Sequence, residues 1–334
     1  MKRIGIVGLK CLGGILALGA LAFIGLYIGS CGDYRLPDTV NENPDLTAIE
    51  LNGTRLHYKE AGSSSNPTII LVHGGPGGDF TSLLSLEPLS DRYHLVWYDQ
   101  RGSGLSARNV SADSLTVDQF IEDLHAIVTH FGGGRPVILF GHSWGGMLSA
   151  AYTGRYPRTV SHLILAEPGF LTAETSDPVI NPDVSLGMLT GMLYSWFQSL
   201  HVDDSDEYAA GDFWLNGVMR VANPAYYCPD ANPHNVIVRA GYEAWYNVAV
   251  KGIGNSANDG SLNLTQGLDK FTGPSLIIAG ACNTAIGPEH QEKHLPLVPN
   301  SRLVTIADAG HFMFQDKPVE TMTMIQNFLN AVNL

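Results

Sequence analysis

Short apolar runs separated by polar turns recur along most of the chain and predict the strands of a sheet. Four runs are apolar at almost every position, a pattern typical of strands that are covered on both faces. These runs are Thr68–Val72, Tyr93–Tyr98, Val137–Phe140 and His162–Ala166. Other runs that fit strands are Thr47–Leu51, Leu56–Glu60, Pro274–Ala279 and Arg302–Ile306.

Between the strands the hydrophobic period changes to that of a helix. From Val117 to Phe131 apolar residues recur every three or four positions, which predicts an amphipathic helix. Thr116 with Gln119 predicts a capping box at its start, and Gly132–Gly134 predicts its end. Further helices are expected at Glu289–Leu295 and Pro318–Val332. Because strands and helices alternate, the sheet is expected to be mostly parallel.

The alternation stops between residues 171 and 271. This stretch mixes Trp, Tyr and Met with loop residues and contains no strand-like apolar run. We expect a mainly helical cap insertion here, between the two parts of one α/β core at residues 46–170 and 272–334. Residues 32–45 have the polar, proline-containing composition of a tether.

The first 31 residues form a separate segment. Lys2, Arg3 and Lys10 precede an uncharged apolar run that extends to about Ile28, as in segments that direct a chain to or across a membrane. Residues 28–31 resemble a bacterial lipobox, which makes Cys31 a candidate for lipidation. An uncleaved N-terminal anchor and simple secretion are the alternatives. We expect an extracytoplasmic, membrane-anchored protein.

Charge and cysteine content narrow the possible partners. The chain has 19 basic and 32 acidic side chains and a net charge of −13. Three basic residues and no acid lie in residues 1–30, so the remainder has a net charge of −16 and is not expected to bind nucleic acid. Apart from Cys11 and Cys31, only Cys228 and Cys282 occur, without metal-ligand spacing. We expect two buried free thiols, with pairing in an oxidising compartment as the alternative.

The sequence Gly-His-Ser-Trp-Gly at residues 141–145 places a serine between a predicted strand and a predicted helix. In this context Gly-x-Ser-x-Gly forms a nucleophile elbow, because small residues must flank the serine on a strained turn. We therefore predict that Ser143 is a nucleophile.

A serine nucleophile needs a base, an acid that orients the base, and donors for an oxyanion. His311 follows the last predicted strand and is the predicted base, since α/β-hydrolases have the chain order Ser, acid, His. The backbone N–H groups of Trp144 and Gly75 are the predicted oxyanion donors. His142 is expected to point under the elbow, and His73 to brace its own loop.

Three motifs together resemble the proline iminopeptidase branch of the α/β-hydrolases. They are His73–Gly77, Asp99–Ser106 and Gly141–Gly146. The resemblance covers about residues 46–334 and implies an α/β-hydrolase fold, a mostly parallel eight-stranded sheet and a helical cap. It also implies cleavage of an N-terminal residue, often proline, from peptides or arylamides. In the Asp99 loop we expect a turn braced by Arg101 rather than a catalytic group.

The acid departs from the pattern of this family. Relatives usually place an aspartate shortly after the seventh strand, where this chain has Asn283. An amide can hold a histidine but cannot stabilise the imidazolium by charge. Glu167 ends the sixth predicted strand, in a position resembling that of the acid in a group of haloalkane dehalogenases. We expect Glu167 to be the acid, with Asn283 as the alternative position, and Asp308 to tighten the turn before His311.

The resemblance also implies cap glutamates that bind the amino group of a substrate. The candidates are Glu174, Glu207 and Glu243. Glu243 and Trp245 lie in an aromatic segment that suits a small cyclic residue, so both are candidate substrate-binding residues.

These features predict a serine hydrolase that acts through an acyl-enzyme on a small molecule or short peptide. We expect proline iminopeptidase-like cleavage of an N-terminal residue. A carboxylesterase or lactonase acting on a small apolar acyl group is the alternative. A non-catalytic ligand-binding protein of the same fold is the third hypothesis. No cofactor and no metal are expected.

Overall fold

The computed structural model describes residues 2–176, 185–203, 206–221, 224–229 and 237–331, with side chains from residue 14 onward. The chain divides into two units. The first comprises Met1–Leu36 and Val184–Val221, and the second comprises Pro37–Asp183 and Ala222–Leu334. The residues of the predicted triad all belong to the second unit.

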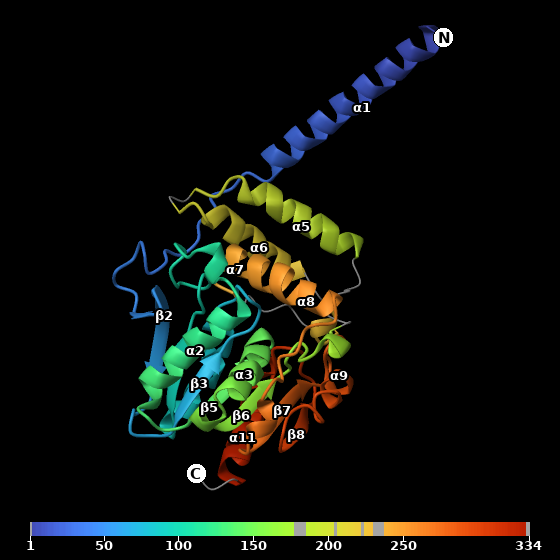
Figure 1. Ribbon diagram of the computed structural model, residues 1–334. Coiled ribbons are helices and arrows are strands. Elements are labelled where there is room, and N and C mark those ends of the chain that lie inside the picture. Colours follow the sequence, from blue (N-terminus) through green and yellow to red (C-terminus); the bar gives the residue numbers. More distant parts are fainter. Residues whose placement is uncertain (1, 177–184, 204–205, 222–223, 230–236, 332–334) are drawn as a thin grey trace. The chain divides into compact units, whose positions relative to one another are not determined.

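An eight-stranded sheet with the order β1-β2-β4-β3-β5-β6-β7-β8 forms the centre of the second unit (Figure 1). The strands are β1 (Ala48–Leu51), β2 (Thr54–Ala61), β3 (Thr68–Val72), β4 (His94–Tyr98), β5 (Val137–His142), β6 (Val160–Ala166), β7 (Ser275–Gly280) and β8 (Ser301–Ile306). The pairs β1–β2 and β2–β4 are antiparallel, and the other five pairs are parallel. The prediction of a mostly parallel eight-stranded sheet is confirmed.

Helices cover both faces of this sheet. Apolar side chains of α2 (Val117–Gly132) and α3 (Trp144–Arg155) pack on one face. Those of η1 (Phe80–Asp91), α10 (Met313–Asp316) and α11 (Pro318–Ala331) pack on the other. Strands β3, β4 and β5 are buried at every position, as their continuous apolar runs predict. The predicted end of the last helix at Val332 lies outside the described residues.

Helix α2 shows how local sequence sets an element boundary. The Thr116 hydroxyl accepts the N–H of Gln119 at 3.2 Å, and Gly133 ends the helix with a φ of 58°. The side-chain amide of Gln119 donates to Asp123 Oδ1 at 3.1 Å instead of completing the predicted capping box. Asp123 also receives two hydrogen bonds of 2.7 Å from Arg101, which braces the turn after β4 as predicted.

The described parts of residues 171–271 are mainly helical. In the second unit they form α7 (Tyr242–Ala244), the π-helical η6 (Trp245–Gly254) and α8 (Asn255–Asn258), together with the short turns η4 (Ala173–Thr175), η5 (Pro224–Tyr226) and η7 (Leu268–Lys270). Pro288–Glu292, which forms α9, follows β7.

The first unit consists of α1 (Lys2–Gly29), α5 (Leu186–Ser199) and α6 (Ala209–Val221). The ring of Phe23 on α1 lies 5.2 Å from that of Phe197 on α5, and His201 Nε2 donates to the carbonyl oxygen of Tyr27 at 2.8 Å. Within the part of the chain that the structure describes, no helix is both long enough and apolar enough to cross a membrane.

Candidate active site

Ser143 lies on a sharp turn between β5 and α3. Its φ of 54° and ψ of −121° fall in a region that residues with a side chain rarely occupy, and such backbone strain is common at functional sites. Two residues further on, a Cβ on Gly145 would lie 2.0 Å from the carbonyl oxygen of Val72, so only glycine fits there. The start of α3 therefore packs against the end of β3, and the glycine at position 145 makes this close contact possible.

The glycine loop after β3 lies against this turn. A Cβ on Gly74 would come within 3.0 Å of Ser143 Cβ, and the next residue, Gly75, has a φ of 50°. Trp144 is the first residue of α3, and the first N–H groups of a helix have no partner within it. Both predicted oxyanion donors therefore come from backbone segments that adjoin Ser143.

Gln100 connects the two segments that carry these donors. Its side-chain amide donates to the carbonyl oxygen of His73 at 2.9 Å, and its Oε1 accepts the indole N–H of Trp144 at 2.8 Å. Its backbone N–H donates to His73 Nε2 at 3.0 Å, so His73 braces the loop as expected. The sequence alone did not reveal this role of Gln100, although Gln100 directly follows Asp99 in the Asp99–Ser106 motif.

Strand register brings the predicted histidine and acid together. Residues 142 and 166 are paired between β5 and β6, so the residues that follow, Ser143 and Glu167, leave neighbouring strand ends. His311 Nδ1 donates to Glu167 Oε2 at 2.6 Å, and both side chains are buried. His142 Nε2 donates to the carbonyl oxygen of His311 at 2.9 Å and so helps to hold the loop that carries His311.

Two other donors converge on the Glu167 carboxylate. The N–H of Gly280 donates to Oε1 at 2.7 Å, and Asn283 Nδ2 donates to Oε2 at 2.6 Å. Asn283 Oδ1 in turn accepts the backbone N–H groups of Ala285 and Ile286, both at 3.0 Å. The side chain at the usual position of the acid thus hydrogen-bonds to Glu167, and Glu167 hydrogen-bonds to the histidine.

Burial sets the protonation of this pair. It lowers the pKa of His311 to about 3 and raises the pKa of Glu167 well above its ordinary value. The hydrogen bonds from Gly280 and Asn283 act in the opposite direction on the pKa of Glu167, because they stabilise the carboxylate. His311 is therefore a neutral imidazole at pH 7, and the hydrogen bond from its Nδ1 to Glu167 leaves Nε2 as the acceptor.

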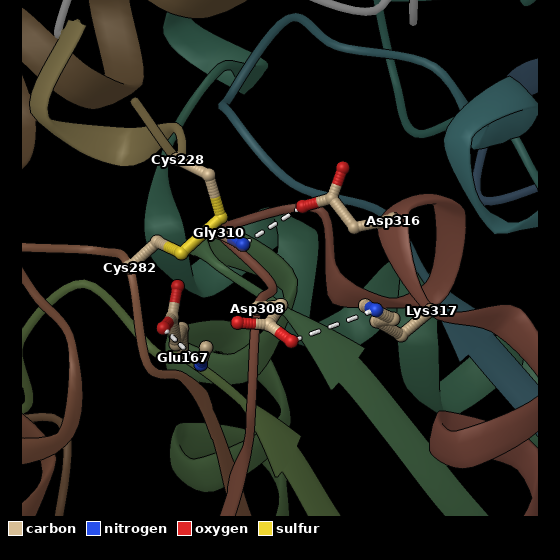
Figure 2. Close-up of a disulfide and its surroundings, with 8 residues drawn as sticks. Glu167, Cys228, Cys282, Asp308, Gly310, Asp316 and Lys317 are labelled. Carbon is tan, nitrogen blue, oxygen red and sulfur yellow. Dashed lines mark hydrogen bonds and ion pairs between the residues drawn. A yellow bond between two sulfur atoms is a disulfide. The ribbon is translucent and has the colours of Figure 1, made fainter. Parts of the chain in front are cut away.

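Asp308 makes no hydrogen bond to His311 or Glu167 in the described structure. It is exposed, has a φ of 52°, and its carboxylate lies 3.9 Å from the ammonium group of Lys317 (Figure 2). Asp308 therefore lies in the turn before Gly310 and makes an ion pair with Lys317, and its tightening of this turn stays a prediction.

The candidate cap residues differ in exposure. Glu174 and Glu207 are exposed, whereas Glu243 is half-buried and its Oε2 accepts Asn247 Nδ2 at 3.2 Å. Trp245 is also half-buried, and its Cβ would lie 3.1 Å from a Cβ on Gly77. The structure therefore places the segment with Glu243 and Trp245 next to the glycine loop that carries Gly75.

The same cap segment holds the glycine loop through Asp79. One Asp79 oxygen accepts the N–H groups of Val238 at 2.5 Å and Arg239 at 3.2 Å, and Gly241 N–H donates to the Gly77 carbonyl at 2.8 Å. Burial, and then the nearby Asp99, raise the pKa of Asp79 to about 6. The sequence reasoning missed this connection as well, since the two segments are about 160 residues apart.

The expectation of two free thiols is wrong. Cys228 and Cys282 form a disulfide with a Cα–Cα distance of 4.8 Å (Figure 2). Spacing along the chain did not reveal the bond because the loop after β7 and the segment after η5 meet only in the folded chain. Cys31 is exposed and forms no disulfide with the described residues, and its Sγ lies 3.8 Å from His201 Nε2. Among the described residues, no group of three or more His, Cys, Asp or Glu is placed to hold a metal ion.

Comparison with known proteins identifies relatives with several activities. The sequence pattern of the alpha/beta hydrolase fold family matches residues 67–318. A proline iminopeptidase from Heyndrickxia coagulans is 27% identical over 300 residues, which are 85% of this chain and 98% of the relative. Epoxide hydrolase 1 from Caenorhabditis elegans is 24% identical over 303 residues, 87% of this chain and 72% of the relative.

Solved structures with a similar fold also cover most of the chain. The malate-bound structure of a thermophilic esterase from Thermogutta terrifontis has a TM-score of 0.61 at 20% identity, covering 86% of this chain and 98% of that chain. The shared fold and the range of activities among the relatives support a hydrolase without selecting one substrate.

Proposed function

The chain belongs to the α/β-hydrolase fold family, and we propose that it is a serine hydrolase whose catalytic triad is Ser143, His311 and Glu167. The observation that carries the proposal is the 2.6 Å hydrogen bond between His311 Nδ1 and Glu167 Oε2. This bond orients a neutral imidazole at the end of the sheet where Ser143 lies on its strained turn.

The proposed reaction has two acyl-transfer steps. His311 Nε2 accepts the proton of the Ser143 hydroxyl while its oxygen attacks the substrate carbonyl, and the N–H groups of Trp144 and Gly75 stabilise the oxyanion. His311 then protonates the leaving group, and an acyl-enzyme ester remains. Water attacks this ester with His311 as base, which releases the acid and restores Ser143. Glu167 stabilises the imidazolium in both steps.

Labelling with a fluorophosphonate tests the nucleophile without knowledge of the substrate. Ser143→Ala should abolish labelling and turnover and leave the melting temperature nearly unchanged, because it removes one half-buried oxygen. His311→Ala should slow labelling strongly. Undiminished labelling of the Ser143→Ala protein would contradict the assignment, and absent labelling of the wild type would support the non-catalytic binding protein.

Within this class we propose cleavage of an N-terminal residue, often proline, from small peptides or arylamides. The likeness to a proline iminopeptidase over 98% of its length and the position of Glu243 and Trp245 beside the glycine loop support this proposal. Glu243 would bind the free amino group. Its replacement by Gln should then reduce kcat/KM for a proline arylamide by at least about tenfold. The exposed Glu174→Gln is the matched control and should have no effect.

One observation favours the rival, a carboxylesterase or lactonase. Glu243 Oε2 already accepts an amide hydrogen bond from Asn247, one helical turn away, so part of its hydrogen-bonding capacity is used within its own helix. A panel of prolyl arylamide, N-acetyl-prolyl arylamide and short-chain p-nitrophenyl esters separates the two functions. An iminopeptidase requires the unblocked amine, whereas an esterase prefers the esters and is insensitive to Glu243→Gln.

We also propose that the N-terminal segment places the enzyme outside the cytoplasm, attached to a membrane. The basic residues before the apolar run, the exposed Cys31 and the Cys228–Cys282 disulfide, which persists in oxidising compartments, support this location. Intact-mass analysis of the membrane fraction tests it. A lipoprotein begins at a lipidated Cys31 and is lost in Cys31→Ala, whereas an anchored form retains residues 1–30.

A further inference from the structure

The segment Pro224–Cys228, here called the clasp segment, contacts two loops of the candidate site. Its Ala225 carbonyl accepts the N–H of Thr284 at 2.9 Å, and Cys228 is bonded to Cys282, so it is fixed to the loop that carries Asn283. The N–H of Cys282 donates to the carbonyl oxygen of Ala309 at 2.9 Å, next to Gly310, which Figure 2 draws together with the disulfide. The clasp segment is therefore attached on both sides of Tyr226 to the loop whose Asn283 hydrogen-bonds to Glu167.

The other contacts of the clasp segment are made to His311. The carbonyl oxygen of Tyr226 accepts the backbone N–H of His311 at 2.7 Å, and the two rings lie 4.4 Å apart at an interplanar angle of 34°. A Cβ on Gly310 would lie 2.3 Å from this same carbonyl, so only glycine allows the approach. The neighbouring Tyr227 stacks instead on Phe312, at 5.9 Å.

From these contacts we propose that the clasp segment, which the Cys228–Cys282 disulfide attaches to the loop after β7, keeps His311 in hydrogen-bonding position with Glu167. Within this segment Tyr226 is a positioning residue that shields the imidazole from water. This inference rests on the proposed triad. It adds a residue from the inserted part of the chain, which neither the motifs nor the comparisons assign to the site. The disulfide then has a catalytic consequence besides its effect on stability.

Several titratable groups face His311 and surround the imidazole whose pKa should change if water is admitted. Glu167 lies on its Nδ1 side, the His142 ring lies 4.4 Å away from the end of β5, and Tyr226 covers it from the clasp segment. Asp316 of α10 accepts the N–H of Gly310 at 2.7 Å, and its charge acts on Glu167. Burial among these groups lowers the pKa of His311, so admission of water should raise that pKa towards its ordinary value.

The test is the pH dependence of fluorophosphonate labelling and of turnover in three variants. Tyr226→Ala should lower kcat by about tenfold or more with KM changed less than about threefold, and should move the acid limb of labelling upward by at least about one pH unit. Tyr226→Phe keeps the ring next to His311 and should leave the acid limb where it is in the wild type. Tyr227→Ala, the matched control in the same segment, should leave the acid limb in place.

The disulfide is tested in the folded protein. Cys228→Ser together with Cys282→Ser, or the wild type with this bond reduced by a phosphine, should shift the acid limb in the same direction as Tyr226→Ala. Should Tyr226→Ala fail to fold, the reduced wild type and Tyr226→Leu supply the same readout. An unshifted acid limb in a folded Tyr226→Ala protein that has lost turnover would overturn the proposal, because a merely structural role predicts that result. Failure of the triad itself would appear separately, as a wild type that is not labelled.

Discussion

The carboxyl ends of β6 and β7 lie side by side and carry two side chains of different charge. Glu167 follows β6, has a φ of 42° and contacts His311, whereas Asn283 follows β7 and contacts Glu167. Relatives of the branch that this chain resembles usually carry the acid after β7. In the proposed triad the acid therefore lies at the end of the neighbouring strand, from which it still contacts His311, because adjacent parallel strands end at the same edge of the sheet.

The largest effect is expected from removing the charge after β6. Glu167→Gln should lower kcat by about 10² to 10⁴, because the imidazole loses both control of its tautomer and its counter-charge. Steady-state turnover and the rate of fluorophosphonate labelling measure this loss. Activity near that of the wild type would show that Glu167 does not support His311.

The second variant asks whether the end of β7 can still accept the charge. Glu167→Gln combined with Asn283→Asp should recover about tenfold or more of the activity lost in the single variant, since a carboxylate returns next to the histidine pair. The comparison is made at pH 7 with the same substrate. If the double variant is no more active than Glu167→Gln, a carboxylate at position 283 cannot replace the one at position 167 as the partner of His311.

A carboxylate at both positions should shift the pH profile. In Asn283→Asp the new carboxylate replaces a donor that lies 2.6 Å from Glu167 Oε2, and two carboxylates at that distance do not both ionise. The shared proton is lost only at higher pH, so the acid limb of kcat/KM should move upward and activity at pH 6 should fall by about tenfold. A large gain in turnover instead would mean that position 283 is the better place for the acid.

Removal of the amide should have a smaller effect on turnover. Asn283→Ala leaves Glu167 with its bonds to His311 and Gly280, so kcat should fall by about threefold to tenfold. The acid limb should rise, because the hydrogen bond from Asn283 lowers the pKa of Glu167. The N–H groups of Ala285 and Ile286 lose their acceptor, at a cost of about 1–3 kcal/mol in stability, which thermal unfolding measures.

The smallest expected effect is the pH dependence of stability. The pKa of Glu167 is raised by burial in the folded state, so its contribution to stability is present at low pH and is lost as the pH rises through that pKa. Gln does not titrate, so the Glu167→Gln protein lacks this loss. As the pH is raised from 5 to 8, its melting temperature should therefore increase by a few degrees relative to that of the wild type. Asn283→Asp should show the opposite trend. Parallel curves for all three proteins would contradict the pKa assignment.

Features that depend on burial or local turns were predictable from sequence. The apolar runs place all eight strands within two residues of their observed starts, and Thr116 and Gly133 set the ends of α2. Buried strands have a continuous apolar composition, and caps depend on neighbouring residues, so both leave a local signal. The same local signal made Ser143 and His311 candidates, because Ser143 directly follows β5 and His311 lies in the loop after β8.

Features that depend on contacts between distant segments were not predictable. The sequence left Glu167 and Asn283 as alternatives and favoured free thiols at Cys228 and Cys282. It also gave no sign that Gln100 or Tyr226 contacts the site. Each of these contacts depends on which strand ends and loops adjoin after folding.

Two levels of information thus determine this protein. The sequence by itself determined a buried, mostly parallel sheet and a serine on a strained turn, since hydrophobic period and glycine placement act within a few residues of the chain. Only the tertiary structure decided that Glu167 hydrogen-bonds to His311, that Asn283 hydrogen-bonds to Glu167, and that Cys228 and Cys282 form a disulfide near the contact between the Tyr226 and His311 rings. The physical reason is that a hydrogen bond of 2.6 Å depends on strand register and loop path, which side-chain chemistry read along the chain does not fix.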